Sequence, residues 1–270
     1  MCPSGLFRGR KRNMLDVFLI EGQLVWNIPL MAGLFCMGVL YVALLRTHSE
    51  LKVHPTQPLL FFSSLFLLYL TMGSPLSTLN HLLFSLHMIQ MSILFFVIPP
   101  LFLLGIPETH TPIIKGISLS PFAALVTFAI MFFFYHLQAV LTFLTLNPFI
   151  HNSYLFLLLL LSFMIWRPIV REQNKQYAFL SGILLLPACG QLILSGLFGS
   201  VTNPLLSEMM TSLCITPAGL NSLGIFPSAF NSRIDLIIAG ILMMGMHKFA
   251  LLLTARLKNK VIERDLTGNG

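Results

Sequence analysis

The amino-acid sequence predicts an all-α integral membrane protein, a seven-transmembrane-helix bundle with the N-terminus outside and the C-terminus in the cytoplasm. Three observations predict this class: the composition, a series of long apolar ranges, and the uneven placement of lysine and arginine between them. Apolar residues make up 56% of the 270 residues, and charged residues only 9%. Soluble domains usually carry about 25% charged residues, so this composition is typical of an integral membrane protein.

Seven ranges are long and apolar enough to form helices that cross a bilayer. A hydrocarbon core of about 30 Å needs roughly 20 mostly apolar residues per helix. The predicted spans are residues 24–45, 57–73, 82–104, 118–144, 150–169, 178–199 and 234–254. We therefore expect a single seven-helix membrane domain over residues 14–256, followed by a basic cytoplasmic tail over residues 257–270.

The orientation follows from lysine and arginine, which favour the cytoplasmic side of a membrane. One set of connections and the C-terminal end contain Arg46, Lys52, Lys115, Arg167, Arg171, Lys175, Lys248, Arg256, Lys258, Lys260 and Arg264. The opposite connections, residues 74–81, 145–149 and 200–232, contain no lysine or arginine. The first set is therefore predicted to be cytoplasmic. The net charge of +7 reflects this asymmetry and contact with anionic lipid, and it does not indicate nucleic-acid binding.

The first residues of the chain contradict this rule, because their cations would lie outside the membrane. These cations are Arg8, Arg10, Lys11 and Arg12. A start at Met14 would remove all of them. We therefore interpret residues 1–13 as an over-extended or disordered N-terminal segment.

Several side chains that can bind a metal ion interrupt the apolar spans near their predicted outer ends. His87 and Met91 are four residues apart in the third span, so on a helix they share one face. An imidazole beside a thioether suits copper, above all the soft Cu(I) ion. His81 opens the third span and His151 opens the fifth, both at a similar depth. These four residues are the candidate Cu(I) ligands.

Two further polar residues lie near the same depth. His136 is in the outer half of the fourth span, and Asp235 opens the seventh. We expect both to support a ligand or to lie at the interface; Asp235 could pair with Arg233 or orient a ligand imidazole. The alternative for every histidine is a hydrogen bond within the bundle, and most methionines simply fill gaps in the packing.

Other unusual residues have structural interpretations. Pro99 and Pro100 remove two helical hydrogen bonds and are predicted to bend the third span near its inner end. Gln90 is next to the metal-ligand pair but points to another face, so we expect it to make a different contact. Trp166 and His247 lie near span ends, where interfacial anchoring accounts for them.

Three stretches together resemble the CtaG-type cytochrome c oxidase assembly factors, in the branch found with caa-type oxidases of bacilli. The most specific is HMIQM at residues 87–91, followed by PPLFLLGIP at residues 99–107. The second is His151 followed by a leucine-rich span that ends in WRPI at residues 166–169. The third is Asp235 opening a final span that contains Gly240.

The resemblance implies a non-catalytic factor of the bacterial plasma membrane that matures a haem-copper oxidase. Its partners would be oxidase subunits, and it would deliver copper or hold an assembly intermediate. Many relatives have histidines where this chain has Met91 and Leu155. The four-histidine cluster is thus reduced to His87 and His151, with Met91 as a thioether substitute. Methionine keeps Cu(I) as the expected cofactor, and the departure leaves open that no metal binds.

Other functions are compatible with the same residues. A transporter of copper or another small solute would use similar ligands, although the sequence contains no inverted repeat. A b-type haem protein would use histidines on two helices as axial ligands. A pure scaffold would bind an oxidase subunit through its helix faces. Both a monomer and a homodimer fit the sequence.

Overall fold

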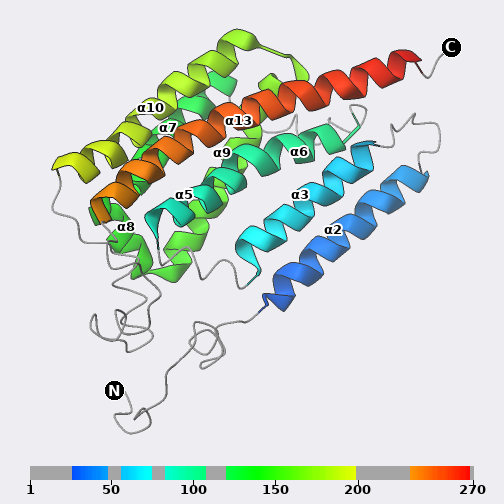
Figure 1. Ribbon diagram of the computed structural model, residues 1–270. Helices are drawn as coiled ribbons and strands as arrows, with labels where there is room; N and C mark the ends of the chain where they lie inside the picture. The colour runs from blue at the N-terminus through cyan, green and yellow to red at the C-terminus, as the bar shows by residue number, and fades with distance from the viewer. Residues whose placement is uncertain (1–25, 48–55, 75–82, 108–119, 199–231, 268–270) are drawn as a thin grey trace, which may run out of the picture.

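The computed structural model of the protein describes residues 26–47, 56–74, 83–107, 120–198 and 232–267, and these residues form helices and no strands. The helices pack side by side, with α2 (Ile28–Thr47) at one edge of the bundle (Figure 1). Residues 1–13, His81 and nearly all of the 200–232 connection lie outside the described residues, so the predictions made for them are not addressed.

Five helical segments among the described residues are long and apolar enough to cross a membrane. They are Ile28–Thr47, Phe84–Gly105, Pro148–Arg171, Lys175–Phe198 and Arg233–Asn259. Two further apolar helices, α3 (Thr56–Met72) and α7 (Pro121–Tyr135), are shorter. Each of the seven predicted spans therefore overlaps an apolar helix of the described residues, five of these helices are long enough to cross a membrane, and the protein is a helical membrane protein.

The third predicted span is helical throughout but changes its winding in the middle. It consists of α5 (Phe84–Ser92), the π-helical turn η1 (Ile93–Val97) and α6 (Ile98–Gly105). Pro99 has no N–H group, so the carbonyl of Phe95 cannot receive the hydrogen bond of a regular α-helix. The proline pair therefore disturbs the helix one turn before its own position, where the chain forms the π-helical turn η1.

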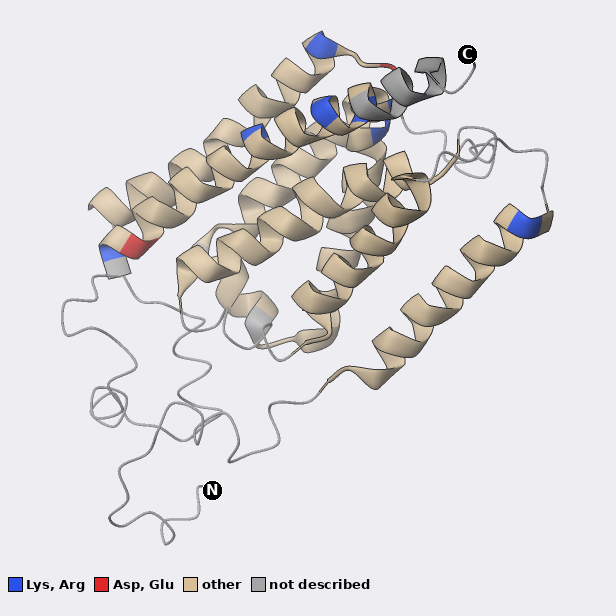
Figure 2. Ribbon diagram, turned by 45° about the vertical axis from the view of Figure 1, so that its right-hand side comes forward, with Lys and Arg blue, Asp and Glu red and all other residues tan. Residues whose placement is uncertain are grey.

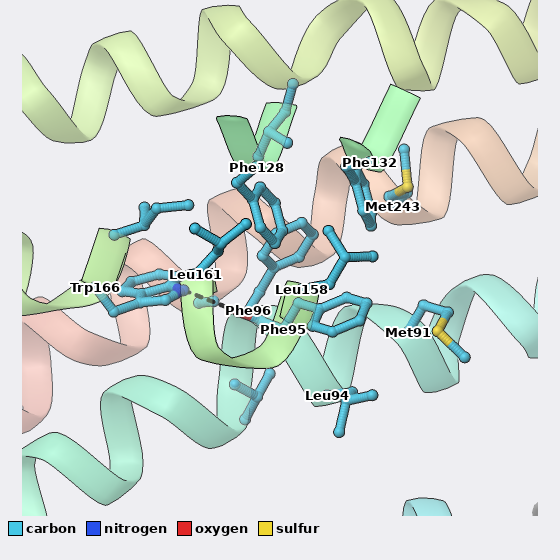
Figure 3. Close-up of a cluster of buried hydrophobic side chains, with 14 of the residues drawn as sticks. Met91, Leu94, Phe95, Phe96, Phe128, Phe132, Leu158, Leu161, Trp166 and Met243 are labelled. Atoms are coloured by element: carbon cyan, nitrogen blue, oxygen red, sulfur yellow. Dashed lines mark hydrogen bonds between the residues drawn. The ribbon is translucent and has the colours of Figure 1, made fainter. Parts of the chain in front are cut away.

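The carbonyl oxygen released in this way finds two donors on the neighbouring helix α9 (Pro148–Arg171). The hydroxyl of Ser162 and the indole nitrogen of Trp166 both donate to the oxygen of Phe95, the latter at 2.9 Å (Figure 3). Phe128 and Phe132 of α7 pack around the same place. The centre of the bundle is thus an aromatic core in which the carbonyl oxygen of Phe95 keeps hydrogen-bond donors.

Two residues predicted to lie at the membrane interface belong to this core. Trp166 is only 1% exposed and His247 only 5%. The imidazole of His247 meets the ring of Phe96 edge-on, with centroids 5.1 Å apart. The interfacial prediction is wrong for both, because a position near the end of a span does not determine which face of the helix a residue occupies.

The fourth predicted span, residues 118–144, is two helices and not one. Helix α7 ends at Tyr135, and α8 (Gln138–Thr145) begins after a break at His136 and Leu137. The backbone N–H groups of both break residues bond to carbonyls only three positions earlier, which closes the helix tightly. The break places Tyr135 and His136 at a helix end inside the protein.

Close packing between helices depends on two glycines of the stretches that resemble the CtaG family. A Cβ atom on Gly105 would lie 2.6 Å from the backbone nitrogen of Phe61, so only glycine lets α6 touch α3 this closely. A Cβ atom on Gly240 would lie 2.8 Å from the carbonyl oxygen of Cys189, where α10 (Lys175–Phe198) crosses α13 (Ser232–Thr267). Small residues of this kind are typical of helix contacts in membranes.

Two cations cover the ends of α6 and α9. The guanidinium of Arg171 donates to the carbonyls of Leu103 and Ile106 at 2.8 and 2.7 Å. The ammonium of Lys258 donates to the carbonyls of Val170 and Arg171 at 2.6 and 2.9 Å. Each cation satisfies carbonyls at the C-terminal end of a helix and interacts favourably with its dipole. Helix α13 continues to Thr267 through most of the predicted tail.

Candidate functional site

The first turn of α5 is capped by an aspartate on another helix. Asp235, 5% exposed at the start of α13, accepts the backbone N–H of Phe84 at 2.7 Å and that of Ser85 at 3.2 Å. Amides in the first turn of a helix have no partner within the helix, and a carboxylate there also interacts well with the dipole. Asp235 therefore supports His87 through the backbone of α5, and it is buried within the protein.

The phenol of Tyr135 joins two of the candidate ligands. Its hydroxyl oxygen lies 3.2 Å from Nε2 of His87 and 3.1 Å from Nε2 of His151. The three side chains come from α5, α7 and α9, and each imidazole lies roughly parallel to the phenol ring. A phenol has one hydrogen, so it donates to one imidazole and accepts from the other. We call the imidazoles of His87 and His151, together with the hydroxyl of Tyr135 that joins them, the phenol-bridged pair.

Sequence reasoning missed Tyr135. The available signal was a phenol directly before His136 in an apolar span, which has the same reason to find a polar partner as a histidine does. In the structure Tyr135 is 0% exposed and His87 is 2% exposed, whereas His151 is partly exposed. The phenol-bridged pair therefore reaches from the interior to the surface of the described bundle.

An imidazole and a thioether do meet, but they are not the pair that the sequence suggested. Nε2 of His136 lies 3.1 Å from the sulfur of Met88, and its Nδ1 lies 2.6 Å from the carbonyl oxygen of Phe132. Met91, the predicted thioether, lies in the hydrophobic cluster with Leu94 (Figure 3). A ligand role for Met91 remains a prediction.

Gln90 makes a different contact, as predicted. Its side-chain amide donates to the carbonyl oxygen of Thr71 at 2.5 Å, which ties α5 to the end of α3. The five-residue stretch HMIQM thus faces three surroundings: His87 meets the phenol, Met88 meets His136, and Gln90 meets α3.

In the described part of the chain, no three His, Cys, Asp or Glu side chains lie close enough together to hold a metal ion. Beside the two imidazoles, the phenol of Tyr135 is the polar group that the described residues bring to the same point.

The comparison with protein families decides the identity of the chain. The model of the cytochrome c oxidase caa3 assembly factor family, Caa3_CtaG, matches residues 39–257. The chain belongs to this family. The range matched in this CtaG-family protein contains the phenol-bridged pair, the His136–Met88 contact and the prolines of α6. No curated protein and no solved structure matches it.

Proposed function

We propose that this CtaG-family protein handles Cu(I) while a haem-copper cytochrome c oxidase is matured, and that the phenol-bridged pair holds the ion. The observation that carries the proposal is the single oxygen of Tyr135 shared by the Nε2 atoms of His87 and His151. Two imidazole nitrogens that converge on one point suit a Cu(I) ion, which accepts few ligands. Met91 and His81 are further candidate ligands.

The phenol gives such a site a satisfied empty state. Without copper, Tyr135 hydrogen-bonds both imidazoles, so no buried nitrogen of this bridge loses its partner when the ion leaves. With copper, the imidazoles turn to the ion and the phenol is displaced or becomes a third ligand. A delivery protein needs this balance, because an ion held too tightly is not handed on.

We propose that the protein spans the bacterial plasma membrane seven times, with its N-terminus outside. The described Lys and Arg residues gather where α2 and α9 end (Figure 2). Arg233 lies at the other end, at the start of α13. Because cations favour the cytoplasm, this pattern supports an outer position for the phenol-bridged pair, which lies near the starts of α5 and α9.

Packing beneath the pair favours delivery over transport. Leu158 is 0% exposed and Phe95 is 0% exposed, so the middle of the described bundle is filled directly below the imidazoles. A transport path would have to pass through this core. A haem between the two histidines is also disfavoured, because the buried ring of Tyr135 occupies the space between them. We propose a non-catalytic role, with an oxidase subunit as the receiving partner.

The decisive test is the copper content of the oxidase in cells that carry His87→Ala. We expect oxidase copper and oxidase activity to fall together at least severalfold while haem a absorption remains, because a late metal-insertion step is lost. His247→Ala serves as the matched control, since it removes a buried imidazole outside the pair. Immunoblots of the membranes establish equal protein levels. Normal oxidase copper in both His87→Ala and His151→Ala would refute the proposal.

A further inference from the structure

We propose that His136 and Met88 form a second Cu(I) site beside the phenol-bridged pair. The proposal shares only the identity of the ion with the proposed function, because it stands on a separate contact. Both side chains are buried, with exposures of 7% for His136 and 1% for Met88. Their contact joins the break after α7 to the first turns of α5.

The hydrogen on His136 is assigned by its other neighbour. Nδ1 lies 2.6 Å from the carbonyl oxygen of Phe132, and a carbonyl can only accept, so Nδ1 must carry a hydrogen. In a neutral imidazole the other nitrogen then has none. Nε2 of His136 therefore presents a lone pair.

That lone pair faces an atom that cannot donate. The sulfur of Met88, 3.1 Å from Nε2, is a thioether with lone pairs of its own and no hydrogen. Two electron-rich atoms thus meet in a buried place without a hydrogen between them. A second proton on the imidazole would supply one, but it would bury a positive charge, which is strongly unfavourable. A bound cation resolves the conflict directly.

The donors and their surroundings fit Cu(I). Imidazole with thioether selects this soft ion. Metal-bound histidines usually donate their second N–H to a backbone carbonyl, which is the arrangement seen between His136 and Phe132. With metal bonds of about 2.0 Å to nitrogen and 2.3 Å to sulfur, the two donors need to separate by only roughly half an ångström for trigonal binding.

The second site lies beside the first on α5 and at the end of α7. His87 and Met88 are consecutive, as are Tyr135 and His136, and the rings of the last two have centroids 5.5 Å apart. The tight break after α7 is what presents Tyr135 and His136 in succession to α5. An ion that leaves one pair therefore meets a second set of donors without crossing the bundle.

Cu(I) binding to the purified full-length protein tests the proposal. X-ray absorption of the Cu(I)-loaded wild type should show a sulfur neighbour at about 2.3 Å. Met88→Leu keeps the volume of the side chain and should remove one bound ion per chain together with its sulfur neighbour. Met243→Leu is the matched control, because Met243 is a buried methionine of α13 outside both proposed sites and its loss should leave the sulfur signal and the number of bound ions unchanged.

Two results would overturn the assignment. One is a wild-type Cu(I) spectrum without any sulfur neighbour, which needs no variant to fold. The other is a Met88→Leu protein that binds as many Cu(I) ions as the wild type and keeps an unchanged sulfur signal. The double variant His87→Ala/His151→Ala separates the two proposals: it should still bind one Cu(I) ion through sulfur, even if oxidase maturation does not depend on the phenol-bridged pair.

Discussion

The middle of the bundle and the start of α5 each bury polar groups, but they balance donors and acceptors in opposite ways. In the middle, Phe95 loses one donor because of Pro99 and receives two, from Ser162 and Trp166. At the start of α5, by contrast, Nε2 of His136 and the sulfur of Met88 meet without a hydrogen between them, whereas the phenol of Tyr135 satisfies both imidazoles of its pair.

This difference separates a structural site from a candidate binding site. A buried acceptor that has its donors adds rigidity and needs nothing else. A buried surplus of acceptors remains unfavourable until a cation joins it. The stretch from His87 to Pro107 thus combines a proline pair that shapes the fold with a histidine that we propose as a ligand.

The largest effect is expected in the middle of the bundle, from the double variant Ser162→Ala/Trp166→Phe. It removes both donors to Phe95 and leaves a buried carbonyl without a partner, which costs about 1–3 kcal/mol, with further loss from the smaller side chains. We expect a clear fall in the free energy of unfolding in detergent. Cu(I) bound per folded chain should stay unchanged. A variant as stable as the wild type would show that the carbonyl of Phe95 does not need these two donors.

A smaller effect, of a different kind, is expected from Tyr135→Phe. The change removes the hydroxyl that satisfies the imidazoles of His87 and His151 in the empty state, so the empty protein loses about 1 kcal/mol. Because the copper-bound state does not need that hydroxyl, we expect Cu(I) affinity to rise about fivefold. Competition with a Cu(I) chelator measures it. A fall in affinity would instead identify the phenol as a ligand.

The sequence predicted the helices well because long apolar ranges leave few alternatives in a membrane. Each of the seven ranges overlaps an apolar helix of the described residues, and the disturbance at Pro99 was foreseen from its missing N–H group. The break after Tyr135 was not foreseen, because the apolar range continues through it. What marks the end of the helix is that the next two backbone N–H groups bond to carbonyls three residues earlier instead of four. Hydrophobicity reports where helices lie, and not where they are interrupted.

The sequence predicted which residue types gather in the candidate site, but only some of the residues that make the contacts. Spacing within one helix suggested His87 with Met91, whereas the contacts that form run between helices and join Met88 to His136. The relative rotation and height of two helices depend on packing across the whole interface, which a single sequence does not specify. Tyr135 was missed for the same reason.

The smallest effect is expected from Gln90→Leu, which separates the signature stretch from its metal chemistry. Gln90 lies between Met88 and Met91 in sequence, but its amide donates to the carbonyl of Thr71 and not to either donor cluster. Losing that hydrogen bond should lower stability by about 1 kcal/mol. Cu(I) stoichiometry and oxidase copper should not change. If Gln90→Leu lowered copper binding as much as Met88→Leu does, both effects would come from disturbed packing of α5. The contact between Nε2 of His136 and the sulfur of Met88 would then no longer distinguish this end of the bundle from its middle.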